Sequence, residues 1–207
     1  MTQPELDITA AEFPQPETMQ DLIHVLRRFG VNIAYWGEGE AKSEDQLLRE
    51  IQEGESVFRE TTAGELMRDV QGVGVDVFYY DPETGSVYRL REDRQVFKDG
   101  RTRSRSHIPE SLSEKRKPAE TPLEAAERAV REELQIEGEL NFRHLGQRLH
   151  TRPSVSYPGL NTRHNVDIFG TMISPQQYRS EGYTENRDGL TSYFVWEQFS
   201  QDSQKAV

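Results

Sequence analysis

The chain has 207 residues, a formal net charge of −11 and a hydrophobic content of 34%, which predicts one domain, or a compact domain with an extension. The mean hydropathy of −0.82 indicates a heavily charged surface. The negative charge disfavours nucleic acid and anionic membranes as general partners, because the field of the protein repels polyanions. The absence of cysteine excludes disulfides, thiolate catalysis and cysteine zinc sites.

Three features of the sequence predict a cytoplasmic protein. The N-terminal stretch MTQPELDITAAEFPQPE lacks the basic and apolar regions of a signal peptide. No run of the chain approaches the roughly 20 apolar residues that a membrane-spanning helix needs. A cysteine-free composition also fits a reducing compartment.

In the first part of the chain, 1–66, the sequence pattern predicts a loose arm followed by a helical extension. Residues 1–17 carry three prolines and several acids, as is typical of irregular structure. Apolar residues recur at helical spacing over 19–29, and a second helix with a capping-box spacing at its start is predicted over 43–51. Between these helices, the alternation over 31–36 predicts a short strand.

In the second part of the chain, 67–200, the sequence pattern predicts a sheet covered by helices. The remaining residues, 201–207, are expected to form a flexible tail. Strands both precede and follow a central helix, which favours an α+β fold with a mixed sheet. The expected elements are a hairpin of strands 73–80 and 86–90, a helix over 121–134, and strands over 143–151, 165–173 and 192–196.

A basic, polar segment over 98–117 separates the hairpin from the central helix. Its composition predicts an exposed and mobile loop, with one short strand near 107–108. Arg101, Arg103 and Arg105 are candidates for a phosphate clamp, because guanidinium forks match phosphate oxygens. The alternative is a loop that only keeps the protein soluble.

The central helix has a well-defined start and one apolar side. Thr121 and Pro122 occupy the N-cap and first helical positions, and Glu124 completes a capping box. Apolar residues then recur at intervals of three and four, which predicts a buried stripe. The stripe consists of Leu123, Ala126, Val130 and Leu134.

At roughly 100° per residue, Ala129, Glu132 and Glu133 fall together on one flank of that stripe. Paired carboxylates of this kind suit magnesium, a hard cation that prefers oxygen ligands. The alternative is an ordinary surface helix, which pairs of opposite charge at i and i+4 would stabilise by themselves.

The segment 120–136 resembles the Nudix box, written G-x5-E-x7-R-E-U-x-E-E-x-G-U with U an aliphatic residue. The matching residues are Glu120, Arg128, Val130, Glu132, Glu133 and Ile136. The resemblance covers about 68–200 and implies a Nudix-like α/β/α sandwich, with the N-terminal helical extension outside it.

Three positions depart from the Nudix pattern. Glu114 and Gln135 stand where the family has glycine, and Ala129 replaces the glutamate that follows the arginine. In the family that glutamate is a principal metal ligand, and alanine offers no oxygen. Glu127 cannot replace it, because two residues along a helix turn a side chain by roughly 200°.

The resemblance implies metal-assisted hydrolysis of a nucleoside diphosphate linked to another group, with Mg²⁺ or Mn²⁺ as the cofactor and a nucleotide diphosphate-type small molecule as the partner. It implies that Glu120, Glu132 and Glu133 bind the metal. Arg128 joins Glu132 and Glu133 as a catalytic residue, because it would orient the carboxylates.

Other roles follow less directly from the sequence. A general base in this family often comes from a later loop, and Glu181 and Glu185 are the candidates. Tyr157 lies in a turn-rich segment, 154–163, from which its ring could stack on a base; the alternative is a plain proline-glycine turn. The five histidines are scattered without ligand spacing and are expected to be structural.

Two functions from different classes therefore stay open. One is a Nudix-type hydrolase weakened by Ala129. The other is a catalytically inactive Nudix-like module that binds a nucleotide or a protein for regulation. A carboxylate brought to the gap beside Ala129 would favour the enzyme, whereas apolar packing there would favour the module. The oligomeric state also stays open, a homodimer included.

Overall fold

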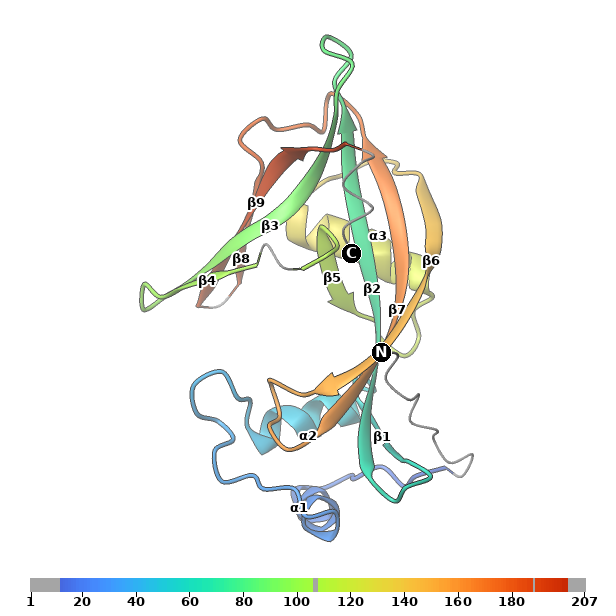
Figure 1. Cartoon of the computed structure of the whole chain (residues 1–207), viewed down its shortest axis with the longest axis vertical. Helices are drawn as coiled ribbons and strands as arrows, with labels where there is room; N and C mark the ends of the chain where they lie inside the picture. The colour runs from blue at the N-terminus through green and yellow to red at the C-terminus, as the bar shows by residue number, and fades with distance from the viewer. Residues whose placement is uncertain (1–11, 106–107, 188, 201–207) are drawn as a thin grey trace. The chain divides into compact units, whose positions relative to one another are not determined.

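The computed structural model describes residues 12–105, 108–187 and 189–200 (Figure 1). The described residues form three α-helices and nine β-strands, which confirms the predicted α+β class with a mixed sheet. The elements are α1 Met19–Arg28, α2 Glu44–Gln52, β1 Val57–Glu60, β2 Leu66–Tyr80, β3 Val87–Phe97, β4 Thr102–Ser104, β5 Leu112–Lys115, α3 Pro122–Leu134, β6 Phe142–Pro153, β7 Asn161–Ile173, β8 Tyr183–Arg187 and β9 Leu190–Gln198.

The strands follow the order β6-β7-β2-β3-β9-β8, with β1 and β5 also paired to β2 and β4 paired to β3. The predicted hairpin is the antiparallel pair of β2 and β3, in which Phe78 lies opposite Arg89. Five of the predicted strands are confirmed, as β2, β3, β6, β7 and β9. Strand β8 pairs with β9 in antiparallel register.

The chain divides into two compact units. Unit 1 consists of Met1–Gln71, Lys115–Ala119 and Arg148–Val166, and unit 2 consists of Gly72–Glu114, Glu120–Gln147 and Asp167–Val207. Strands β2, β6 and β7 contribute residues to both units. Two later segments of the chain belong to unit 1 together with its N-terminal residues.

Unit 1 is built on the two N-terminal helices, and both predicted helices are confirmed. Each begins with a capping box, from Thr18 in α1 and from Ser43 in α2. Leu22 and Leu47 are fully buried in the core that the helices share with Phe58. The strand predicted over 31–36 is wrong: this segment forms turns.

Unit 2 places one helix on a sheet (Figure 1). Val73, Val75 and Val77 alternate along β2, so that their side chains share one face of the strand. These three valines are buried and pack in one core with Ala126 and Val130 of α3. The predicted central helix is thus confirmed, with Thr121 as its N-cap.

The basic segment 98–117 is not a plain exposed loop, which corrects the prediction. It forms β4 and β5, and Leu112 is 2% exposed. The hydroxyl of Ser111 donates to the carbonyl of Leu90 at 2.6 Å and accepts from the amide of Val77 at 3.0 Å. Backbone pairing and this hydroxyl order a segment that is poor in apolar residues. The strand expected near 107–108 lies partly outside the described residues, and 201–207 lies wholly outside.

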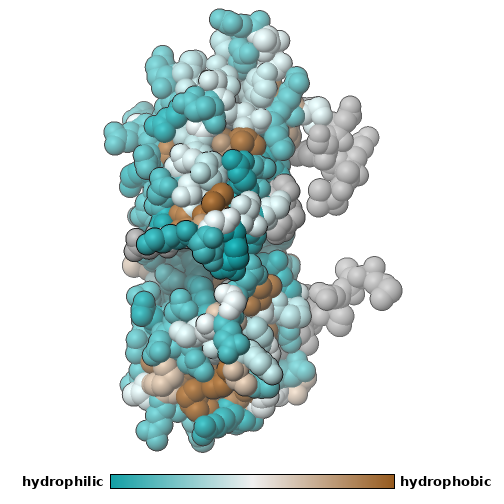
Figure 2. Space-filling view, turned by 90° about the vertical axis from the view of Figure 1, so that its left-hand side faces the viewer, coloured by the Kyte–Doolittle hydropathy of each residue, from teal (hydrophilic) through white to brown (hydrophobic). Residues whose placement is uncertain are grey.

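Hydrophilic residues cover most of the face shown in Figure 2, with apolar residues exposed in small groups. This surface agrees with the low mean hydropathy of −0.82. Among the helices of the described residues, none combines the length and apolar composition of a membrane-spanning helix.

Candidate active site

Helix α3 buries the predicted stripe except for its first residue. Leu123, expected in the buried stripe, is 43% exposed, whereas Ala125 and Ala129 are buried beside Ala126 and Val130. Small side chains let a helix backbone approach a sheet closely, and the three alanines on this side of the helix outweigh one leucine near the helix start. The prediction of the stripe is therefore wrong at its first residue.

This orientation decides the surroundings of Ala129. Its side chain is 1% exposed and lies in the apolar core of unit 2, together with residues such as Val75 and Phe169. A metal ligand is not expected in a cluster of apolar and aromatic side chains such as this one. Taken alone, this packing favours the non-hydrolysing module.

Arg128 binds Glu120 through two parallel hydrogen bonds. Its Nε donates to Oε1 of Glu120 at 2.7 Å, and its Nη2 donates to Oε2 at 3.0 Å. Its Nη1 lies 3.3 Å from Oε2 of Glu132 and 3.8 Å from Oε1 of Glu114. The hydrogen bonds to Glu120 raise the pKa of Arg128, although burial opposes this effect. The arginine thus ties the segment before α3 to the helix.

Glu133 is the buried carboxylate of the helix. It is 6% exposed, and among the described residues its Oε1 has no hydrogen-bond partner. Burial raises the pKa of Glu133 well above its usual range, and the negative charge of Glu185 raises it further. Arg187 opposes these effects, while Glu114 and Glu92 add to them.

Arg187 lies among carboxylates from three elements. Its Nε donates to Oε1 of Glu185 on β8 at 2.5 Å. Its Nη2 lies 3.7 Å from Oε1 of Glu133 on α3 and 3.8 Å from Oε2 of Glu114 on β5. We call Glu114, Glu133 and Glu185 the carboxylate cluster. Glu133 is the most deeply buried member of the cluster in its side chain, at 8% exposed.

Two of the three metal ligands predicted from the sequence meet at one arginine, and the third contacts another. Glu120 and Glu132 both contact Arg128, whereas Glu133 contacts Arg187. No group of three or more acidic or histidine side chains in the described part of the chain is arranged as a ready metal site. The carboxylate cluster nevertheless fits a divalent cation by donor type, because hard cations prefer carboxylate oxygens. The buried Oε1 of Glu133, which lacks a hydrogen bond, is the strongest sign of this fit.

The two candidates for the general base lie in different surroundings. Glu185 is 8% exposed and beside Glu133. Glu181 is exposed, and its Oε2 accepts a hydrogen bond from the hydroxyl of Ser180 at 3.3 Å. Sequence reasoning missed Arg187, which shares a face of β8 with Glu185. The i, i+2 spacing of the two residues was the available signal, but β8 itself was not predicted.

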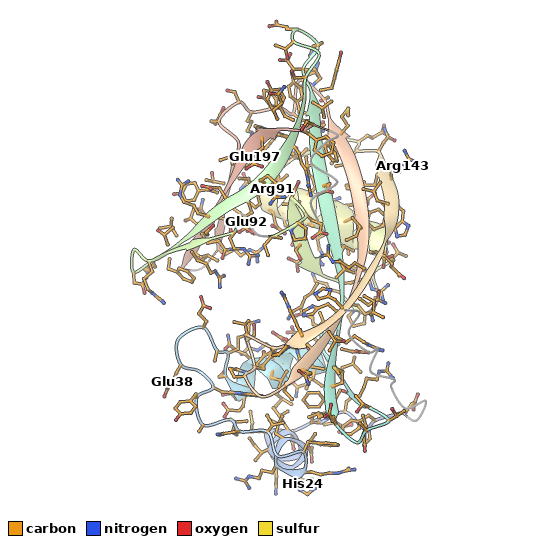
Figure 3. All side chains as sticks on the ribbon, in the orientation of Figure 1. His24, Glu38, Arg91, Glu92, Arg143 and Glu197 are labelled. Atoms are coloured by element: carbon orange, nitrogen blue, oxygen red, sulfur yellow. The ribbon has the colours of Figure 1, made fainter. Side chains whose placement is uncertain are left out.

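The three arginines of the proposed phosphate clamp are each engaged near β3. Arg101 pairs with Asp99 at 2.7 Å, and Arg103 donates to Gln95 at 2.5 Å. Arg105 donates to Oε2 of Glu92 at 2.9 Å. Glu92 is labelled on β3 in Figure 3, and its charge acts on Glu133. The basic segment 98–117 thus pairs through Arg105 with Glu92, whose charge acts on Glu133.

Tyr157 lies in unit 1 and is fully buried. Its ring centroid is 5.2 Å from that of Trp36, and Cζ of Arg68 lies 5.0 Å from the ring centre. A ring covered in this way has no exposed face on which a nucleotide base could stack.

A groove of about 680 Å³ lies along another side of α3. Glu127 and Arg131 line it together with the segment 136–142. None of the members of the carboxylate cluster lines this groove, so its size by itself does not mark the place of the chemistry.

The chain matches no protein-family model and no curated protein. Its structure is similar to solved Nudix structures. One is an Ap4A hydrolase from C. elegans, with a TM-score of 0.37 and 13% identity, in a match that covers 65% of this chain and 83% of that chain. A MutT/Nudix family protein from Enterococcus faecalis has a TM-score of 0.40 and 14% identity, and the match covers 62% of this chain and 43% of that chain. A Nudix hydrolase from M. smegmatis has a TM-score of 0.39 and 15% identity, and the match covers 68% of this chain and 78% of that chain.

Proposed function

We propose that this chain is a weakened Nudix-type hydrolase with a Nudix-like fold. It would cleave the diphosphate of a nucleoside diphosphate derivative at the carboxylate cluster. One observation carries the proposal: Glu133 is buried, has an oxygen without a hydrogen bond, and shares the cation of Arg187 with two carboxylates from other elements. Crowding like charges at a buried position is costly, and perturbed groups of this kind gather at functional sites.

The residues present suit Mg²⁺ or Mn²⁺. Glu133 and Glu114 would hold the cation, and Glu185, the one base candidate beside Glu133, would accept the proton of the attacking water. A bound cation would supply neutralisation of the phosphate charge and a lowered pKa for water. Arg128 would act as a positioning residue, since its hydrogen bonds hold Glu120 and reach Glu132.

Ala129 sets the expected strength of this activity. The alanine removes one carboxylate from the flank of α3, and the cluster recovers only part of that charge from β5 and β8. Misplacing an acid–base group typically lowers a rate by about 10²–10⁴. We therefore expect slow hydrolysis.

The second candidate function is a regulatory module that binds a nucleotide or a protein without hydrolysing it. The apolar packing around Ala129 favours it. The guanidinium of Arg187 also favours the regulatory module, because it already neutralises part of the negative charge of the carboxylate cluster.

A phosphate-release screen over nucleoside diphosphate derivatives, with Mg²⁺ or Mn²⁺, separates the two functions. We expect slow release by the unsubstituted chain and at least a tenfold loss in Glu133→Gln and in Glu185→Gln. Glu139→Gln is the matched control, because Glu139 is an exposed glutamate beyond the end of α3. Binding of a nucleotide without any release would establish the module instead. Release that neither cluster variant lowers would place the chemistry elsewhere.

A further inference from the structure

We infer that Arg187 is an internal cation of the candidate site: it holds the carboxylate cluster together in the metal-free chain and competes with a divalent cation for the same oxygens. This inference rests on the proposed function, since it concerns the cation that the cluster would bind. The guanidinium lies within 3.8 Å of oxygens of Glu114, Glu133 and Glu185.

The contacts of Arg187 with the three carboxylates are unequal in length, and this inequality favours replacement of the guanidinium by a divalent cation. Only Glu185 receives a short hydrogen bond, at 2.5 Å. Glu133 and Glu114 lie at 3.7 and 3.8 Å, which is beyond hydrogen-bond distance. The guanidinium therefore reduces the repulsion among the carboxylates but leaves Oε1 of Glu133 without a hydrogen bond. A divalent cation is smaller and more highly charged than a guanidinium, and it prefers carboxylate oxygens as ligands.

The position of Arg187 also permits it to leave. Its side chain is 51% exposed, whereas that of Glu133 is 8% exposed. A long side chain anchored on a strand can turn into solvent without moving the backbone. The buried Glu133 has no comparable freedom, so the cluster stays in place when the arginine departs.

Competition of this kind has a defined signature. Without Arg187 the cluster loses its internal counter-charge, so the metal-free chain should become less stable. The same loss should strengthen metal binding, because no cation has to be displaced first. A purely structural arginine would produce the first effect and not the second.

The test measures the affinity for Mn²⁺ alone, by electron paramagnetic resonance of the free ion, and Tm with and without Mn²⁺. We expect Arg187→Gln to bind Mn²⁺ at least tenfold more tightly than the unsubstituted chain, and to have a lower Tm without the metal. Arg187→Lys keeps the positive charge but loses the planar guanidinium, so its Mn²⁺ affinity and its Tm should lie between those of Arg187→Gln and the unsubstituted chain. Arg143→Gln, at an exposed arginine on β6 in the same unit (Figure 3), should behave as the unsubstituted chain.

Unchanged or weaker Mn²⁺ binding in Arg187→Gln would overturn the inference, and so would the absence of Mn²⁺ binding in every variant. Should Arg187→Gln fail to fold, Arg187→Lys supplies the same comparison. Failure of the proposed function looks different: Mn²⁺ would still bind more tightly to the variant, but no diphosphate would be cleaved.

Discussion

Ala129 shows how the position of one side chain can change an expectation about chemistry. On a helical wheel it falls beside Glu132 and Glu133, as though it marked a missing ligand. In the structure, Ala129 and Glu133 are buried, while the side chain of Glu132 is 59% exposed and contacts Arg128. The three residues share a flank of the helix but not an environment.

The substitution Ala129→Glu tests this difference. The sequence predicts that a restored glutamate raises the rate of hydrolysis. The structure predicts the reverse: a carboxylate placed in an apolar core without a partner should destabilise the protein by roughly 3 kcal/mol or more. We expect a markedly lower Tm and no gain in phosphate release.

Leu123→Glu is the matched control for this test, because Leu123 lies on the same helix and is 43% exposed. It should leave Tm nearly unchanged. A folded Ala129→Glu variant with an unchanged Tm and faster hydrolysis would show that the position faces the site after all.

The end of α3 shows how an element accommodates a departure from the Nudix pattern. Gln135, which stands where the family has glycine, adopts a left-handed conformation with φ of 55°. The backbone there has the form that a glycine would adopt, so the departure lies in the side chain and not in the path of the chain. The left-handed region is strained for residues that carry a Cβ atom.

Gln135→Gly should therefore stabilise the protein by about 0.5–1 kcal/mol, because glycine adopts this conformation without strain. Urea unfolding at neutral pH measures the gain. Gln135→Ala is the control, since alanine keeps the Cβ atom and should bring no stabilisation. Equal stability of the glycine and glutamine forms would mean that contacts of the glutamine side chain offset the strain.

At the scale of the whole molecule, stability should depend on pH through a histidine pair in unit 1. The rings of His150 and His164 are stacked, with centroids 4.9 Å apart. Burial lowers the pKa of His164 to about 4, and the positive charges of His150, Arg152, Arg68 and Arg148 contribute to this shift. The folded protein therefore keeps this ring neutral at a pH where the unfolded chain protonates it.

The sign of the effect follows from the lowered pKa. Above pH 6.5 His164 is neutral in both states, and as the pH falls from 6.5 to about 4 only the unfolded state gains its proton. This linkage removes at most about 3 kcal/mol of stability, less where solvent screens the ring. In His164→Asn the loss over this window should be smaller than in the unsubstituted chain, as measured by urea unfolding.

His24→Asn serves as the control for the pH series, because His24 is an exposed residue of α1 (Figure 3). Its stability should follow that of the unsubstituted chain at every pH. Parallel curves for His164→Asn and the unsubstituted chain would rule out His164 as the source of the dependence.

Much of the fold could be predicted from the sequence where the signals are local. The capping boxes of α2 and α3 and the alternation along the longer strands are encoded within a few residues. Strands β1, β4, β5 and β8 were missed, since short strands such as β4 are held by backbone pairing and carry little apolar pattern. For the same reason the alternation over 31–36 was misleading: no partner strand pairs with it within the described residues.

By itself, the sequence determined the central helix, its capping, the arginine of the motif and the absence of a carboxylate at Ala129. Only the tertiary structure decided that Leu123 is exposed while Ala129 is buried, because rotation about the helix axis depends on close packing of its alanines against β2. Only the tertiary structure brought Glu114, Glu185 and Arg187 to Glu133, because these residues come from β5, β8 and α3. Helical periodicity acts over a few residues, whereas the charges that set the chemistry of a buried carboxylate meet across the fold.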